Sequence, residues 1–361
     1  MDKNIKIINL KDIGYSDFFE NSQRSTNDSN LTPARIIAEH KELYLLKNEI
    51  SEFSARITGK MNFTASSRED YPAVGDWVLI ETLDEKHAII REILPRKTML
   101  VRKSAGNSDQ QIIASNIDAA FIIQSLDIDY NLNRFERYLS LVLSGNIEPI
   151  ICLNKADLIT QSELEIKISE IKTRFSNTPI YATSIITGNG IAELREGIKQ
   201  GLTYCFIGSS GVGKSSLVNM FLGENLIKTG EINSYTHRGK HITSHRELFV
   251  LENGGILIDT PGMRELGILD SETGIENVFN EIYELSNNCR FSDCTHINEP
   301  KCAVLSAVDS GNLDKDKYDN YIKLLKENEF NTLNKLEKRE KDRSFGKLIK
   351  TTKKQMGKKK F

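Results

Sequence analysis

The first region with a regular pattern of apolar and polar positions runs from residue 34 to about residue 108. Its apolar residues fall in the short runs "ARIIAEHKELYLLKN", "EISEFSARITGK", "VGDWVLIE" and "HAIIREILP", which turn residues separate at fairly even spacing. This pattern predicts a small antiparallel barrel or sandwich, and the size of the segment suits a five-stranded OB-fold barrel. Such barrels often bind oligonucleotides, although a scaffold barrel without a ligand would have the same pattern.

From about Ile112 the pattern changes to continuous apolar runs that alternate with amphipathic ones. The apolar runs are "IDAAFIIQSL", "EPIICLNKAD", "PIYATS" and "LTYCFIGSS", and helical spacing is seen in "NLNRFERYLSLVLSG", "QSELEIKISEIKTRF" and "GIAELREGIKQ". Buried strands that alternate with helices predict an α/β domain whose parallel sheet is covered on both faces. Ligands of such sheets bind beyond the carboxyl ends of the strands.

After Ser292 the chain is rich in cysteine and charge, and "KDKYDNYIKLLKENEFNTLNKLEKREKDR" then has apolar residues at helical spacing. These changes of texture divide the chain into five parts. We expect an N-terminal extension (1–33), an OB-fold domain (34–108), an α/β domain (109–275), a helical domain with a cysteine–histidine cluster (276–337) and a basic tail (338–361).

Composition narrows the class of protein. The chain has 361 residues, of which 39% are hydrophobic and 27% charged, as in soluble globular proteins. It contains neither an apolar run long enough to span a membrane nor a recognisable secretory signal. Five cysteines in a chain of this length do not indicate a disulfide scaffold. We therefore expect a cytoplasmic protein with reduced thiols, and nothing in the sequence indicates more than a monomer.

The net charge of −2 hides an asymmetry, because residues 338–361 carry far more lysine and arginine than acid. A basic tail on an acidic body is typical of proteins that contact a polyanion such as nucleic acid. A tail that lysines merely keep solvated is an equally good interpretation. Within the barrel region, Arg96, Lys97, Arg102 and Lys103 offer a basic rim.

The stretch "GSSGVGKS" at residues 208–215 fits the phosphate-binding loop G-x-x-x-x-G-K-[ST], and it lies between a predicted strand and a predicted helix as that motif requires. Its backbone amides and the helix N-terminus would surround the phosphates. Lys214 is the expected catalytic cation at the β- and γ-phosphates, and the Ser215 hydroxyl is an expected Mg²⁺ ligand. The expected nucleotide-binding residues here are Gly208, Ser209, Ser210, Gly211, Val212, Gly213, Lys214, Ser215 and Ser216.

A second phosphate-side motif follows in "ILIDTPG" at residues 256–262, where an apolar strand runs into Asp-x-x-Gly. Asp259 is placed to hold Mg²⁺ through water, and the Gly262 amide can sense the γ-phosphate.

The stretch "NKAD" at residues 154–157 indicates which base is bound. The Asp157 carboxylate can accept hydrogen bonds from N1–H and N2–H₂ of guanine, a donor pair that adenine lacks. Asn154 would bond the base and join neighbouring loops, and the stem of Lys155 would lie along the purine ring. In "TSIITGNG" at 183–190, Ser184 and the backbone amide of Ile185 would face the guanine O6.

The order of these motifs is unusual, because the base-binding stretches precede the phosphate loop instead of following it. Joining the ends of a GTPase and opening the chain before its base-binding strands would produce this order. Termini that lie close together at the surface make such a permutation feasible. The sequence therefore predicts a circularly permuted P-loop GTPase core.

Cys289, Cys294, His296 and Cys302 form a C-x4-C-x-H-x5-C cluster. Four thiolate and imidazole ligands within so short a segment suit one tetrahedral Zn²⁺ ion. Because four protein ligands leave no open position, the site would be structural. Cys152 and Cys205 lie in apolar strands and are expected in the core.

Together these stretches resemble the small ribosomal subunit biogenesis GTPase A family of circularly permuted bacterial GTPases. The resemblance covers nearly the whole chain from about residue 34 and includes "PAVGDWV", "NLNRFERYL", "NKADL", "GSSGVGKSSLVN", "RGKHITSHREL", "LIDTPGMRELG" and "CRFSDCTHINEPKCAV". It implies an OB-fold, a permuted GTPase core and a zinc-containing helical domain. It also implies binding of GTP, GDP, Mg²⁺ and one Zn²⁺, contact with ribosomal RNA, and GTP hydrolysis stimulated by the small ribosomal subunit during late assembly.

The resemblance identifies "RGKHITSHREL" as the first switch and Thr243 as the residue that senses Mg²⁺, with Ser244 as an alternative. Many small GTPases orient the attacking water with a glutamine that follows Asp-x-x-Gly, but Met263 stands there in this chain. We expect slow intrinsic turnover. His241 and His245 are candidates for positioning the water, and contact with RNA or a loop-capping role is an equally good interpretation of either histidine.

Two alternatives remain open on sequence alone. An RNA-binding assembly factor could use GTP only as a structural or sensing ligand, an idea that Met263 supports and that Lys214, Ser215 and Asp259 oppose. A P-loop ATPase or kinase is the other alternative, and the assignment of Asp157 to guanine opposes it.

Overall fold

The computed structural model describes residues 9–24, 30–40, 43–103, 110–127, 130–223, 247–259 and 272–332. The chain divides into two compact units. Unit 1 comprises residues 1–102 and 109–267, and unit 2 comprises residues 103–108 and 268–361. Among the described residues, no helix is both long enough and apolar enough to cross a membrane.

The N-terminal part of unit 1 is a closed barrel of five strands, as the alternating pattern predicts. Strand order is β1-β2-β3-β5-β4, and pairing of β1 with β4 closes the barrel. All pairings are antiparallel except that of β3 with β5, which is parallel. The five strands are β1 (Thr32–His40), β2 (Leu43–Lys47), β3 (Glu52–Ile57), β4 (Trp77–Thr82) and β5 (His87–Ile93). The connection from β3 to β4 carries the short helices α2 (Gly59–Thr64) and η2 (Arg68–Asp70).

The segment that precedes the barrel is part of its core, which the sequence did not predict. It forms η1 (Leu10–Ile13) and α1 (Asp17–Arg24). Ile13 and Phe19 are buried with Trp77 of β4 in one apolar cluster. The Tyr15 ring meets the Trp77 ring edge-on, with centroids 4.7 Å apart. The N-terminal segment thus packs against the barrel and shares an apolar cluster with it.

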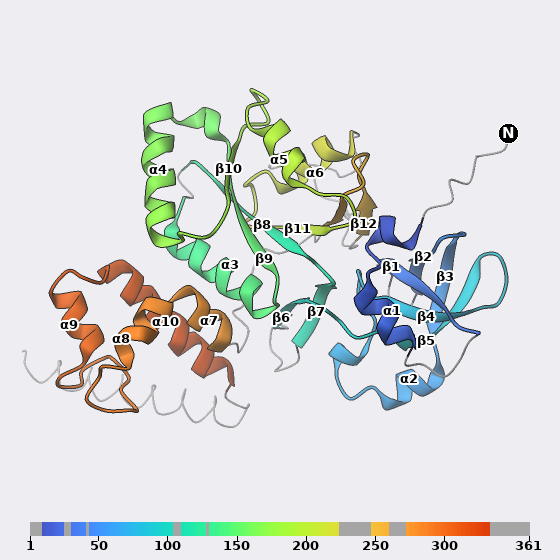
Figure 1. The fold of residues 1–361 in the computed structure, drawn as a ribbon, viewed down its shortest axis with the longest axis horizontal. Coiled ribbons are helices and arrows are strands. Elements are labelled where there is room, and N and C mark those ends of the chain that lie inside the picture. Colours follow the sequence, from blue (N-terminus) through green and yellow to red (C-terminus); the bar gives the residue numbers. More distant parts are fainter. Residues whose placement is uncertain are drawn as a thin grey trace, which may run out of the picture. The chain divides into compact units, whose positions relative to one another are not determined.

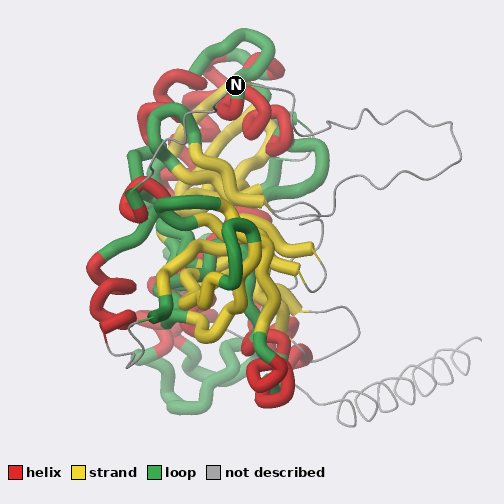
Figure 2. The backbone as a smooth tube through the Cα atoms, turned by 90° about the vertical axis from the view of Figure 1, so that its right-hand side faces the viewer, coloured by secondary structure: helices red, strands yellow, loops and turns green. Residues whose placement is uncertain are grey.

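The second part of unit 1 is the predicted α/β sheet, in the order β10-β9-β8-β11-β13-β12. The five strands from β10 to β13 are parallel, and β12 is antiparallel to β13. On its other side β12 pairs with β1, so the α/β strands and the barrel strands form one continuous sheet. Helices lie on both sides of the sheet, α3 and α4 on one and α5 and α6 on the other (Figure 1). Figure 2 shows the strands in yellow, with helices in red around them.

The elements of this sheet follow the apolar runs of the sequence closely. The strands are β8 (Ala119–Ser125), β9 (Glu148–Asn154), β10 (Ile180–Thr183), β11 (Thr203–Ile207), β12 (Glu247–Val250) and β13 (Ile256–Asp259), and the helices are α3 (Leu132–Ser144), α4 (Gln161–Arg174), α5 (Ile191–Gly197) and α6 (Lys214–Leu222). Every residue of β8 and β11 is buried, as expected of strands covered on both faces. Between the barrel and this sheet, β6 (Met99–Lys103) and β7 (Gln110–Ser115) form a two-stranded sheet of their own.

Besides the pairing of β1 with β12, a fully buried arginine joins the barrel to the α/β part of unit 1. The guanidinium of Arg35, on β1, donates to the carbonyl oxygens of Ile13 at 2.5 Å and Asn116 at 3.2 Å. It also donates to the Thr203 hydroxyl at 2.9 Å, at the start of β11. Burial lowers the pKa of Arg35 to about 10, which still leaves it charged at neutral pH. One cation therefore satisfies acceptors from the N-terminal segment, the barrel-to-sheet connection and the strand that leads to the phosphate loop.

Three members of the predicted basic rim, Arg96, Lys97 and Arg102, have partners within unit 1. Arg96 makes a salt bridge of 2.8 Å with Asp76, whose side chain is fully buried. Asp76 also accepts a hydrogen bond of 2.5 Å from the Ser115 hydroxyl. Lys97 pairs with Asp118, and Arg102 donates to Gln111. These contacts link different segments of unit 1, and the Lys97 side chain remains half-exposed.

Unit 2 is helical around its own apolar core, as predicted. Its helices are α7 (Glu272–Val278), α8 (Asn280–Ser286), α9 (Ala303–Asp309) and α10 (Lys315–Thr332). Phe279 and Tyr321 are buried at its centre with ring centroids 5.3 Å apart. Cys302 belongs to the same core, so the cysteine–histidine cluster is built into the packing of this unit.

Replacing the buried arginine tests whether it joins the two parts of unit 1. Arg35→Met should lower the free energy of unfolding by about 3 kcal/mol or more, because several buried carbonyl and hydroxyl acceptors lose a charged donor. Denaturation can be followed by the fluorescence of Trp77, the single tryptophan, which is buried in the barrel. Arg91→Met, which breaks an exposed pair with Glu81, should cost less than about 1 kcal/mol. Equal stability of the two variants would contradict this role of Arg35.

Candidate functional site

The carboxyl ends of the parallel strands bring the predicted nucleotide-binding residues to one edge of the sheet. Thr183 of β10 lies opposite Asn154 of β9, and Asn154 lies opposite Ser125 of β8. β11 pairs with β8 on its other side and runs directly into the phosphate loop. The chain order reverses direction between β8 and β11, and ligands of open α/β sheets bind at such a switch point.

Asn154 connects the base-binding motif to the phosphate loop. Its Nδ2 donates a hydrogen bond of 2.7 Å to the carbonyl oxygen of Val212, and its Oδ1 accepts one of 3.1 Å from the Thr183 hydroxyl. A Cβ atom at Gly213 would lie 2.2 Å from Asn154 Nδ2, so only glycine fits there. Gly213 also has φ +98°, a conformation that favours glycine. The two motifs, which are far apart in the sequence, are therefore in direct contact.

Asp157 and Ser184 form the other side of the predicted base pocket. The Ser184 hydroxyl donates a hydrogen bond of 2.5 Å to Asp157 Oδ1. Ser184 is itself buried, and its amide donates to the carbonyl oxygen of Asn189. The loop at residues 184–189 is thus closed on itself and fixed to the Asn-Lys-x-Asp turn. The Ile185 side chain lies close to Gly213 and packs against the apolar core of the α/β sheet.

The phosphate loop has the wrapped backbone that its sequence predicts. Gly208 and Gly211 have φ values of +153° and +84°, and the loop ends at Gly213, where α6 begins. The Lys214 ammonium donates to the carbonyl oxygens of Gly208 at 2.8 Å and Ser209 at 2.5 Å. Lys214 is the first residue of α6, and these two hydrogen bonds hold its ammonium group at the start of the phosphate loop.

The structure describes two of the residues predicted to bind Mg²⁺, Ser215 and Asp259. Ser215 is in the first turn of α6, and Asp259 ends β13, the strand next to β11. A serine hydroxyl and a carboxylate at one sheet edge are oxygen ligands that suit Mg²⁺. The remaining predicted switch residues, Thr243, Ser244, Gly262, Met263, His241 and His245, lie outside the described residues.

Asp127 contacts the predicted base-binding turn, a role that the sequence did not indicate. It follows β8 and forms an ion pair of 3.0 Å with the Lys155 ammonium. The Ser125 hydroxyl donates to Asp127 at 2.8 Å, and the Leu126 amide donates to the carbonyl oxygen of Asn154. Lys155 has φ +60°, so the turn that carries it is a left-handed one. The ion pair fixes the direction of the Lys155 side chain, and no known motif in the sequence marked Asp127.

Tyr138 of α3 is a second residue that sequence reasoning missed. Its side chain is buried, and its hydroxyl lies 3.3 Å from the Ser209 hydroxyl of the phosphate loop. The segment from β8 to α3 therefore supports both ends of the predicted nucleotide site, through Asp127 at the base end and Tyr138 at the phosphate end.

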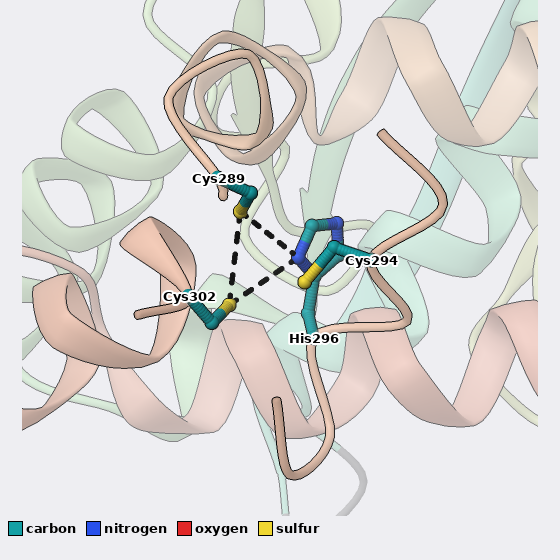
Figure 3. Close-up of side chains that lie close together, drawn as sticks. All are labelled: Cys289, Cys294, His296 and Cys302. Atoms are coloured by element: carbon teal, nitrogen blue, oxygen red, sulfur yellow. Dashed lines mark hydrogen bonds between the residues drawn. The ribbon is translucent and has the colours of Figure 1, made fainter. Parts of the chain in front are cut away.

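The four predicted zinc ligands converge in unit 2 (Figure 3). Their ligand atoms all lie within 4.8 Å of one another. Cys289 Sγ is 3.8 Å from Cys302 Sγ, and His296 Nδ1 is 3.6 Å from Cys289 Sγ and 3.4 Å from Cys302 Sγ. Tetrahedral zinc with ordinary bond lengths requires about 3.8 Å between two sulfurs and about 3.5 Å between sulfur and nitrogen. The cluster therefore fits a zinc ion in both chemistry and dimensions.

The surroundings of the cluster favour the metal-binding forms of His296 and Cys289, whereas burial raises the pKa of Cys294 to about 11. Burial lowers the pKa of His296, which keeps the imidazole neutral at neutral pH. Burial acts to raise the pKa of the Cys289 thiol, but the amides of Ala303 and Val304 and the neighbouring thiols outweigh it and lower the pKa. The loop between the ligands is held by Glu299, whose carboxylate accepts from the Thr295 hydroxyl and from nearby amides. These contacts lower the pKa of Glu299 to about 2.

The other two cysteines are core residues, as predicted. Cys152 and Cys205 are fully buried in β9 and β11. Burial raises the pKa of each thiol to about 12, so both are neutral thiols at physiological pH.

Solved structures with the same architecture establish the class of protein. The crystal structure of YjeQ from Thermotoga maritima is 27% identical, with a TM-score of 0.60, over 82% of this chain and 98% of that one. The structure of YloQ, described as a circularly permuted GTPase, is 26% identical with a TM-score of 0.60, over 85% of this chain and 98% of that one. The fold, the order of motifs and this likeness define a circularly permuted GTPase.

Sequence comparisons identify the family within that class. A family model described as RsgA GTPase matches residues 93–269. The small ribosomal subunit biogenesis GTPase RsgA 1 of Bacteroides thetaiotaomicron is 40% identical, over 96% of this chain and 97% of that protein. RsgA 2 of Lactiplantibacillus plantarum is 39% identical, over 89% of this chain and 91% of that protein. The chain belongs to the RsgA GTPase family and is a GTP hydrolase.

A second family model, described as 50S ribosome-binding GTPase, matches residues 203–336. It begins at β11, the strand that leads into the phosphate loop, and leaves out the upstream base-binding strands. This partial match is the one expected if the order of the GTPase motifs has been permuted.

The ion pair between Asp127 and Lys155 can be tested by a double-mutant cycle. Asp127→Asn and Lys155→Met should each weaken GDP binding by about 3- to 10-fold, because each releases the lysine stem from the position where it would lie along the purine. The double variant should bind no more weakly than Lys155→Met alone, since both changes remove one interaction. Glu81→Gln, which breaks a comparably exposed pair in the barrel, should leave affinity unchanged. Additive losses in the double variant would show that the two side chains act separately.

The proposed zinc site leads to two predictions, one for the zinc content of the protein and one for the folding of unit 2 without zinc. The protein should hold about one zinc ion per chain, and chelation should unfold the helices of unit 2, because the ligands belong to its core. Cys294→Ser should lose zinc and lower the helical signal in circular dichroism, whereas Cys152→Ala should keep its zinc. Full zinc occupancy in Cys294→Ser, measured by mass spectrometry of the metal, would exclude Cys294 as a ligand.

Proposed function

We propose that this chain binds the small ribosomal subunit late in its maturation and hydrolyses GTP in response to it. The observation that carries the GTP-binding part of the proposal is the hydrogen bond from Asn154 to the carbonyl oxygen of Val212, since it joins the base-binding turn and the phosphate loop. The relatives of this chain, which are named small ribosomal subunit biogenesis GTPases, indicate the partner.

In this proposal GTP lies along the carboxyl edge of the sheet. Asp157 accepts hydrogen bonds from the guanine, Ser184 and the Ile185 amide face O6, and Asn154 bonds the base while it holds the phosphate loop. The stem of Lys155 lies along the purine ring, directed by Asp127. The backbone of residues 208–216 surrounds the phosphates, where Lys214 neutralises developing charge on the β- and γ-oxygens.

The magnesium ion would be held by Ser215 and Thr243, and by Asp259 through water, and would supply charge neutralisation at the phosphates. The Gly262 amide would sense the γ-phosphate. Because Met263 offers no hydrogen bond to the attacking water, intrinsic turnover is slow and the water is positioned by another group. His241 and His245 are the proposed candidates within the chain.

The remaining parts of the chain are proposed to hold the ribosomal subunit. The OB-fold domain (34–108), the zinc domain (276–337) and the basic tail (338–361) contact ribosomal RNA, and the GTPase domain (109–275) controls their engagement. Cys289, Cys294, His296 and Cys302 hold one structural Zn²⁺. The protein acts in the cytoplasm as a monomer.

In the proposed cycle, the bound nucleotide controls the affinity of the protein for the small ribosomal subunit. Asp259 ends β13, and α7 of unit 2 begins at Glu272, so the second switch leads directly into the zinc domain along the chain. GTP orders both switches and favours binding of the subunit, and hydrolysis releases it. Equal affinity for the subunit with GDP and with a non-hydrolysable GTP analogue would contradict this cycle.

Multiple-turnover GTP hydrolysis with purified ribosomal subunits tests the proposal. Mature small subunits should raise the turnover rate by at least about 10-fold over the intrinsic rate, since the chain lacks its own water-orienting glutamine. Large subunits serve as the control for non-specific RNA. Lys214→Ala should abolish stimulated turnover because the phosphate loop loses its cation.

Two results would overturn the proposal. Stimulation by large and small subunits alike would remove the assignment of the partner. A chain that binds small subunits but never turns over GTP more than once would instead be an assembly factor that uses GTP as a sensing ligand.

A further inference from the structure

The outer surface of the barrel carries a cavity that the GTPase reaction does not use. Its volume is about 580 Å³, within the range of cavities that hold small ligands. It lies where the end of β3 leads into α2, and Tyr44 of β2 and Gln111 of β7 also line it. None of the residues proposed to bind GTP lines this cavity.

Two exposed arginines that line the cavity have no partner in the described part of the chain. The guanidinium groups of Arg56 and Arg68 make no hydrogen bond, ion pair or ring contact with any described residue. Every other described arginine has such an interaction, from the buried Arg35 to the exposed Arg290, which lies over the Phe291 ring. Two unpaired guanidiniums at one cavity indicate an anionic ligand with more than one charged group.

The cavity also offers an aromatic ring and amide groups. Tyr71 is half-buried in its wall, and the Tyr71 hydroxyl donates a hydrogen bond of 2.9 Å to Asn62 Oδ1. That bond fixes the ring and leaves the amide NH₂ of Asn62 as a donor beside it. On the same helix Phe63 is 90% exposed, the most exposed of the large apolar side chains of the described residues. An aromatic face next to amide groups is the chemistry that holds a nucleobase.

The charge of its lining distinguishes this cavity from a much larger one on the barrel. A cavity of about 1180 Å³ lies at the hairpin between β2 and β3, and the acids Glu49, Glu52, Asp84 and Glu85 line it with Lys47 and Lys86. That cavity is net acidic and repels phosphate. The smaller cavity carries Arg56 and Arg68 against the single acid Glu39. Only the smaller of the two is therefore complementary to a nucleic acid backbone.

The shape of the cavity favours a single strand over a duplex. A base inside an RNA helix is stacked and paired, and so cannot enter a recess in a protein surface. An unpaired base in a loop or bulge can turn outward, stack on an aromatic ring and leave its flanking phosphates at the rim.

We propose that this cavity binds an unstacked nucleotide of single-stranded RNA, with Arg56 and Arg68 on the flanking phosphates and the Tyr71 ring against the base. The inference rests on the proposed function in one respect, because the cavity would provide one of the RNA contacts by which the protein binds the ribosomal subunit. It does not require any change at the GTP site.

Binding of a fluorescent single-stranded RNA oligonucleotide to the full-length protein tests the site. Anisotropy should show that Arg56→Met combined with Arg68→Met weakens binding by about 10-fold or more. The plot of log K against log salt should become shallower by about 1.4, the value for two lost phosphate contacts on a single strand. Arg24→Met removes the same charge from an arginine that is paired with Glu20 and does not line the cavity, so it should change neither quantity.

Two variants of Tyr71 test whether its ring stacks on the base. Tyr71→Leu should weaken oligonucleotide binding by about 5-fold or more without changing the salt slope, because stacking contributes no counterion release. Tyr71→Phe keeps the ring and should retain most of the affinity. Thermal melting by circular dichroism shows whether each variant is folded. A Tyr71→Leu protein that is folded and binds as tightly as the wild type would overturn the assignment of the base.

The outcomes separate this inference from the proposed function. If small subunits stimulate GTP turnover but the arginine double variant binds RNA like the wild type, the cavity is not an RNA site although the proposed function stands. Equal losses for a duplex of the same sequence would overturn the single-strand assignment. Loss of subunit binding with unchanged oligonucleotide binding would mean that the cavity receives a protein instead. If turnover is not stimulated but oligonucleotide binding is lost as expected, the proposed function fails and the RNA site remains.

Discussion

The structure depends on one constraint, the parallel alignment of β8, β9, β10, β11 and β13, whose carboxyl ends meet at a single edge of the sheet. Because that edge is fixed in space, the order in which the chain visits the strands does not matter for the site. Asn154 can donate to the carbonyl oxygen of Val212 although the phosphate loop comes later in the sequence. Circular permutation therefore preserves the GTPase site while it changes what is attached to each end of the core.

The barrel and unit 2 are joined to the two ends of the permuted GTPase core. The barrel enters the GTPase core through β7 and β8, and Arg35 ties it to the N-terminal segment and to Thr203 at the start of β11. The other end of the core leads from Asp259 along the chain to α7 of unit 2, whose core includes the proposed zinc ligands. Both parts proposed to bind the ribosomal subunit are thus linked in sequence to strands that end at the proposed nucleotide site. A binding protein controlled by a nucleotide requires such a connection.

Local chemistry was predictable from the sequence, and long-range pairing was not. The phosphate loop, the Asn-Lys-x-Asp turn and the Cys–His cluster were found because each is a short motif that carries its own geometry. The packing of Phe19 against Trp77 was missed because the first 30 residues have no clear period. Arg96 was expected at a basic rim because its partner Asp76, 20 positions away, could not be paired with it from sequence. Asp127 was missed for the same reason, since its role depends on Lys155 in another loop.

The most direct test of the central claim is a change of base preference at Asp157, measured as nucleotide affinity and turnover. Xanthine carries a carbonyl group where guanine carries its amino group, so Asp157→Asn should lose GTP affinity by about 100-fold and gain affinity for XTP. XTP turnover by this variant should still require Lys214, because one nucleotide spans both residues. An Asp157→Asn protein that keeps its preference for GTP, or that turns over XTP without Lys214, would contradict the convergence of the two motifs on one nucleotide.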